Sequence, residues 1–107
     1  MVKIPADAVI PESKLTQYLL VPRSRNDKSK FLAQGGFTLA NSAALEQAIR
    51  RLIAENEAVE DRTDQFGTFY EVKGTLKGVN EIDLGVVTIW LHQSVDAKFR
   101  FVTLIPD

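Results

Sequence analysis

Four basic side chains within eight residues are the first candidates for chemistry in this chain. Arg23, Arg25, Lys28 and Lys30 stand there against one acidic residue, Asp27. Lysine and arginine bind phosphate oxygens, and a local positive field can attract a phosphate compound to a protein whose net charge is only −1. The segment therefore predicts an anion- or nucleic-acid-binding surface. A solvated loop is the alternative, and the composition leaves both open.

Lys28 lies at a predicted helix start. Asp27 is a suitable N-cap for a short helix over residues 28–34. The free N–H groups of a helix start attract anions, whereas a lysine there opposes the helix dipole. Because Lys28 does not favour its own helix, we expect it to contact an anion. Residues 21–37 would form one wall of the binding cleft, and Lys14 would converge on it.

His92 is the only histidine, and an imidazole is well suited to act as a general base near neutral pH. It ends a predicted strand beside a turn, so an exposed structural role is the alternative. One histidine, no cysteine and no acidic pair at ligand spacing predict no metal site. The sequence has no glycine-rich phosphate loop and no Ca²⁺ loop, so we expect no cofactor.

Length and composition indicate a single globular domain over residues 1–107. The chain is 45% hydrophobic, which is ordinary for a folded domain, and it has no cysteine for disulfides. No apolar run approaches the roughly 20 residues that span a bilayer, and the N-terminus lacks the apolar core of a signal peptide. We therefore expect a cytoplasmic protein that does not bind membranes.

The first half of the chain predicts helices. Pro11 suits the first turn of a helix through ESKLTQYLL, which Pro22 prevents from continuing. After the short helix at residues 28–34, Gly35 or Gly36 can supply the left-handed C-terminal residue. The longest helix should cover residues 42–58, with Asn41 or Ser42 as its cap. Its buried stripe should consist of Leu45, Ala48, Ile49, Leu52 and Ile53.

Beyond an acidic loop at residues 55–64, the hydrophobic period changes to two. Three strands, at about residues 66–76, 82–92 and 98–105, are joined by short turns, which favours an antiparallel meander. The middle strand is apolar on both faces, so it should be interior and covered on both sides. With even register, one row would contain Tyr70, Thr88 and Thr103, and Trp90 would neighbour Phe101.

The predicted fold is therefore α+β, with N-terminal helices packed on a three- to four-stranded antiparallel β-meander. The strings KLTQYLL, DKSKFLAQGGF, FGTFYEV, VVTIWL and FVTLIP resemble signature segments of an uncharacterised bacterial domain family. The resemblance covers residues 4–106. That family is common in cyanobacteria and also occurs at the C-termini of large polymorphic-toxin-like proteins. Its order of helices and strands is similar to that of metal-independent ribonucleases such as barnase, colicin tRNases, EndoU and RelE.

This resemblance implies a set of polar positions that recur in the family. Lys14, Lys28 and Thr103 match them, and Tyr18, Gly67 and Trp90 are implied as structural companions. RNA cleavage without a metal needs a base near the 2′-hydroxyl, a proton donor to the leaving oxygen, and cations that stabilise the phosphorane.

The predicted roles follow from these needs. Lys14 or Lys28 would stabilise the transition state, Thr103 or Tyr70 would orient the phosphate, and His92 would be an accessory group. The alternative for Thr103 is an ordinary strand threonine. For Tyr18 and Trp90 the alternative is core packing.

The best functional prediction is a toxin-type metal-independent ribonuclease or an inactive relative of one. A non-catalytic protein-interaction or nucleic-acid-binding module is the alternative. The expected partners are RNA and a small cognate protein encoded nearby.

Overall fold

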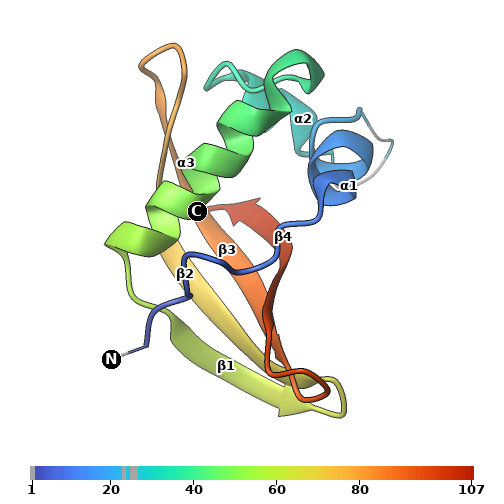
Figure 1. Cartoon of the computed structure of the whole chain (residues 1–107). Helices are drawn as coiled ribbons and strands as arrows, with labels where there is room; N and C mark the ends of the chain where they lie inside the picture. The colour runs from blue at the N-terminus through green and yellow to red at the C-terminus, as the bar shows by residue number, and fades with distance from the viewer. Residues whose placement is uncertain (1, 23, 25–26) are drawn as a thin grey trace.

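The computed structural model describes residues 2–22, 24 and 27–107, and its helices precede a four-stranded antiparallel sheet (Figure 1). The α+β prediction is confirmed. The helical elements, in chain order, are α1 (Glu12–Lys14), the π-helical turn η1 (Leu15–Leu19), α2 (Ser29–Ala33), the 3-10 turn η2 (Leu39–Asn41) and α3 (Ser42–Glu55). The strands are β1 (Val59–Asp64), β2 (Gly67–Lys77), β3 (Asp83–Gln93) and β4 (Phe99–Pro106). No helix in the described ranges is long and apolar enough to span a bilayer.

Helix α3 packs on one face of the sheet through the predicted stripe. Leu45, Ala48, Ile49, Leu52 and Ile53 are all buried and share one core with Trp90 and other sheet residues. The predicted start of this helix at Ser42, with Asn41 as N-cap, is confirmed, whereas its predicted end at Ala58 was wrong. The capping box forms at Thr38, because the Asn41 side chain turns back to accept the Thr38 N–H. The helix stops at Glu55, because Asn56 is extended and the Ala58 N–H bonds to the Val2 carbonyl.

The acidic segment contains strand β1, where the sequence predicted a loop. Glu60 pairs with Tyr70, and Asp64 pairs with Gly67. Five of its six residues are exposed, so β1 lacks the alternation of buried and exposed positions that indicates a half-buried strand. Backbone pairing with β2 rather than side-chain burial therefore places β1 at the sheet edge.

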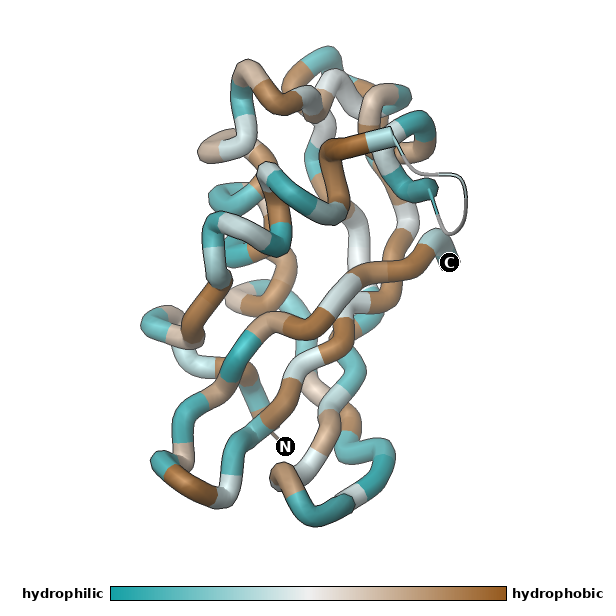
Figure 2. The backbone as a smooth tube through the Cα atoms, turned by 90° about the vertical axis from the view of Figure 1, so that its right-hand side faces the viewer, coloured by the Kyte–Doolittle hydropathy of each residue, from teal (hydrophilic) through white to brown (hydrophobic). Residues whose placement is uncertain are grey.

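Strand β3 is interior, as predicted, and pairs with β2 and β4. The expected cover on both faces is only partial. Val86 and Trp90 are fully buried beneath the helices, whereas Ile89 and Leu91 on the other face are half-buried. Hydrophobic segments recur along the strands, and the turns at the lower end of the sheet are mostly hydrophilic (Figure 2).

The predicted row of Tyr70, Thr88 and Thr103 does not form. Tyr70 pairs with Trp90, which pairs with Phe101 as predicted, whereas Thr103 pairs with Ile89. A bulge makes Val102 an extra residue in β4, so that Thr103 leaves the face that carries Phe101. Without this extra residue in the register, Thr103 would oppose the buried Thr88.

Candidate functional site

Three side chains from distant parts of the chain form a hydrogen-bonded group that we call the Lys28 cluster: Tyr18, Lys28 and Thr103. The Lys28 Nζ donates to the Tyr18 hydroxyl at 3.2 Å and to the Thr103 Oγ1 at 2.9 Å. The Thr103 hydroxyl in turn donates to the Tyr18 oxygen at 3.4 Å. All three side chains are half-buried. The cluster therefore joins η1, the start of α2 and strand β4.

Lys14 approaches the same tyrosine. Its ammonium lies 5.7 Å from the centroid of the Tyr18 ring, and the ammonium of Lys28 lies 5.4 Å from that centroid. Both distances are within the range of a cation–π interaction. The structure therefore brings together Lys14, Lys28 and Thr103, the residues that the sequence proposed as catalytic. Their catalytic roles remain predictions.

The π-helical turn fixes the position of Tyr18. Leu15 and Leu19 are buried in the core, and the Leu20 N–H reaches the Leu15 carbonyl at 3.0 Å. This wide turn lies between two anchored leucines and presents Tyr18 at the boundary between core and solvent. Single π-helical turns are frequent at functional sites.

The short helix α2 fixes the position of Lys28. The Asp27 carboxylate accepts the Ser29 N–H at 2.8 Å, but the helix begins at Ser29, so its N-cap is Lys28 and not the predicted Asp27. At the other end Gly36 is left-handed, with φ of 85°, and the Phe37 N–H bonds to the Leu32 carbonyl. Buried Leu32 and Phe37 then anchor this helix in the core. Lys28 therefore reaches the cluster from the start of a helix that is anchored in the core.

The remaining predicted basic residues do not join these contacts in the described structure. Lys30 is exposed and lines a separate pocket of about 230 Å³ with Leu39. Arg23 and Arg25 lie outside the described residues. The predicted cleft wall at residues 21–37 therefore stays a prediction.

Tyr70 and His92 belong to a different group of side chains. Tyr70 packs against Phe99 with ring centroids 5.5 Å apart, and His92 stacks on the same ring at 4.3 Å. The His92 Nε2 lies 3.0 Å from the Ala97 carbonyl oxygen. Because neighbouring residues of a strand point to opposite faces, Tyr70 and Thr103 lie on opposite faces of the sheet.

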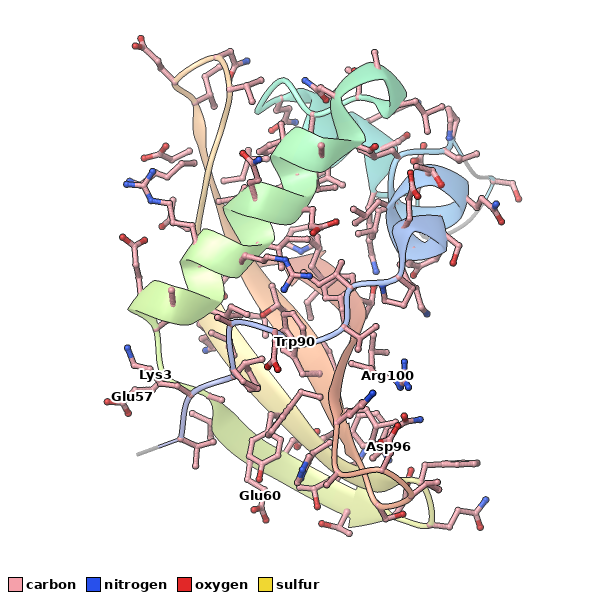
Figure 3. The ribbon with its side chains drawn as sticks, in the orientation of Figure 1. Lys3, Glu57, Glu60, Trp90, Asp96 and Arg100 are labelled. Carbon is pink, nitrogen blue, oxygen red and sulfur yellow. The ribbon has the colours of Figure 1, made fainter. Side chains whose placement is uncertain are left out.

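The β3–β4 turn near His92 holds an ion pair. Asp96 and Arg100 point toward each other there, 3.2 Å apart (Figure 3). The pKa of Asp96 is lowered, first by the hydrogen bond from the Lys98 backbone N–H and then by Arg100. Arg100 also donates to Gln93, so its guanidinium is held within this turn.

Sequence reasoning assigned Tyr18 to core packing and missed its hydroxyl. The available signal was the spacing from Lys14, which places the lysine one helical turn before the tyrosine. For metals, no three histidine or carboxylate side chains gather in the described part of the chain in a way that could hold an ion.

The comparisons with known proteins add a family and a fold. Residues 4–107 match the model named Domain of unknown function (DUF6883). The chain belongs to the DUF6883 family. No curated protein matches this DUF6883 chain significantly in sequence.

A solved structure resembles the DUF6883 chain in fold. It is described as a contact-dependent growth inhibition toxin–immunity protein complex from Klebsiella pneumoniae 342. The match has a TM-score of 0.71 and 21% sequence identity, and it covers 95% of each chain. At this identity the likeness establishes a shared fold.

Proposed function

We propose that this DUF6883 domain is a toxin-type, metal-independent ribonuclease whose phosphate-binding site is the Lys28 cluster together with Lys14. One observation carries the proposal: two ammonium groups lie at one half-buried tyrosine, and within the described part of the chain Lys28 hydrogen-bonds to two hydroxyls. No described residue forms an ion pair with Lys28. The positive charge at this site is therefore available to an anion.

Lysine has three N–H donors, and Lys28 uses two of them on Tyr18 and Thr103. The third can be donated to a phosphate oxygen. Removing a cation partly from water is costly, and a bound anion offsets that cost through a charge-assisted hydrogen bond. The two hydroxyl partners also hold the Lys28 side chain in place, so less side-chain entropy is lost when the phosphate binds.

The chemistry expected of this site is transesterification of RNA. The 2′-hydroxyl attacks the neighbouring phosphorus, and negative charge builds up on the phosphorane oxygens. Lys28, together with Lys14 at the same tyrosine ring, would stabilise that charge, and Thr103 fixes the direction of Lys28. Such a reaction requires no metal ion.

The fold likeness supports the toxin part of the proposal. The similar structure comes from a toxin–immunity protein complex. The resemblance stated from the sequence implies the element order of the ribonuclease group. We accordingly propose that the domain acts on cytoplasmic RNA and is neutralised by a small cognate protein. The site assignment rests on the geometry of this chain alone.

The decisive experiment measures cleavage of bulk tRNA by the purified domain in the presence of EDTA. Wild-type protein should cut RNA, and Lys28→Ala should lose at least about 100-fold in rate, because a transition-state charge contact is lost. Lys30→Ala is the matched control, since Lys30 is a nearby exposed lysine, and it should retain activity. RNA that stays intact with wild-type protein would refute the ribonuclease proposal.

A nucleic-acid-binding module is the second candidate, and one observation favours it. His92, the only histidine, lies outside the Lys28 cluster, so the cluster contains no imidazole base. This module would be supported if RNA migrated more slowly with the protein, was not cleaved, and lost this shift in Lys28→Ala. The affinity for RNA should fall steeply as the salt concentration rises.

A further inference from the structure

We infer that Tyr18 is the general acid of this site and protonates the 5′ oxygen that leaves when RNA is cut. The inference rests on the proposed ribonuclease function and deepens it. It assigns a catalytic role to a side chain whose sequence context predicts core packing.

The hydrogen-bond directions in the Lys28 cluster carry the argument. The phenol oxygen of Tyr18 accepts one bond from Lys28 and one, at 3.4 Å, from the Thr103 hydroxyl. Because an ammonium can only donate, the bond from Lys28 shows that the O–H proton of Tyr18 does not point at Lys28. The Thr103 hydroxyl has the Leu104 carbonyl as a second acceptor, also at 3.4 Å. A leaving 5′ oxygen bound beside Lys28 would be placed to take the Tyr18 proton.

The same contacts favour the state that forms when the proton has left. Hydrogen bonds to an oxygen strengthen when that oxygen becomes negatively charged. The phenolate of Tyr18 would keep the bonds from Lys28 and Thr103, with the Lys14 ammonium 5.7 Å from the ring centroid. The cluster thus stabilises the charge that develops during proton transfer more than the neutral ground state, which is the condition for catalysis.

The other groups of the cluster are less suited to this step. Lys28 directs two of its donors to the hydroxyls, and its charge is needed at the phosphate. The Thr103 hydroxyl is an aliphatic alcohol and a far weaker acid than a phenol.

The 2′ oxygen forms a bond to phosphorus and gives its proton to a solvent water. The bond from phosphorus to the 5′ oxygen breaks, and the electron pair stays on that oxygen, which takes the proton of Tyr18. The products are a 2′,3′-cyclic phosphate and a free 5′-hydroxyl. The Tyr18 phenolate then regains a proton from solvent.

The experiment compares two substrates that differ in their leaving group. In an RNA dinucleotide the leaving 5′ alkoxide needs a proton, whereas in uridine 3′-(4-nitrophenyl phosphate) the nitrophenolate departs without one. Tyr18→Phe should lose about 100-fold on the dinucleotide, which is a common contribution of general acid catalysis. It should lose less than about threefold on the nitrophenyl ester, because that ester bypasses the acid.

Two other variants complete the design. Lys28→Ala should lose rate on both substrates, because both pass through a charged phosphorane. Thr63→Val is the control, since it removes an exposed hydroxyl that bonds to Thr68 at the β1 edge of the sheet, and it should keep wild-type rates.

The outcomes separate the two proposals. Equal losses by Tyr18→Phe on both substrates would reduce Tyr18 to a positioning residue and overturn the general-acid assignment, while ribonuclease activity stands. A wild-type protein that cleaves neither substrate would overturn the proposed function and the assignment together. A loss confined to the dinucleotide supports both.

Discussion

Lys28 has two hydroxyl partners, and the chain allows one of them to be tested almost without a change of shape. Thr103→Val removes the oxygen that accepts the 2.9 Å bond from Lys28, whereas Thr103→Ser keeps it. A hydrogen bond to a charged group contributes about 1.5–3 kcal/mol, so kcat/KM for RNA should fall by about 10-fold or more in Thr103→Val. Thr103→Ser should stay near wild type. Equal activity in the valine and serine variants would exclude a role for this hydroxyl.

The candidate residues were only partly predictable from the sequence. The family resemblance indicated Lys14, Lys28 and Thr103, and these three lie together in the structure. Tyr18 was missed because it lies beside Leu15 and Leu19, where an aromatic residue is normally read as core. The contacts of its hydroxyl come from Lys28, ten residues further along, and from Thr103 in β4, which approach it only in the folded chain.

At the scale of elements, the turn after α2 depends on the left-handed conformation of Gly36. A Cβ there would lie 2.5 Å from a methyl carbon of Val79, and φ is +85°. Gly36→Ala should therefore lower the free energy of unfolding by more than about 1 kcal/mol. Gly85→Ala is the matched control, because a Cβ at Gly85 would meet nothing closer than 3.9 Å.

Urea unfolding measures both alanine variants. Gly85→Ala should change the free energy of unfolding by less than about 1 kcal/mol, because its backbone conformation is open to alanine. If the two variants unfolded at the same urea concentration, the strain assigned to the α2 turn would be disproved.

The elements that the sequence predicted well are those with an unbroken period. The α3 stripe repeats at helical spacing and is buried in full, and β3 is apolar enough to require the sheet interior. The β4 register failed for a different reason. Phe101 and Leu104 are both buried although they are three residues apart, which a regular strand forbids. This spacing was the available signal for the bulge at Val102.

For the whole molecule, charge is divided between the two edges of the sheet. The β1 edge carries Glu60 and Asp61, whereas β4 at the other edge contacts Lys28 through Thr103. Under the proposed function, the acidic edge would repel RNA and the basic side would attract it, so a phosphate chain would be steered toward the Lys28 cluster. The near-neutral total charge of −1 conceals this arrangement.

Growth of a bacterial host tests the function of the molecule as a whole. Induced wild-type domain, without a cognate protein, should arrest growth within the time needed to degrade essential RNA. Lys28→Ala should permit growth at equal protein level, and Lys30→Ala should not. Growth arrest by Lys28→Ala equal to that of wild type would show that toxicity has a cause other than this site.

The buried indole of Trp90 gives the molecule an optical signal of its own. This single tryptophan is fully buried, meets Phe101 edge to face at 5.3 Å, and donates its N–H to Thr88 at 2.8 Å. An indole shielded from water emits at shorter wavelength than one in solvent, so its fluorescence reports the contact between helices and sheet. A variant of Tyr18, Lys28 or Thr103 that loses the proposed activity but keeps the short-wavelength emission has kept its core intact.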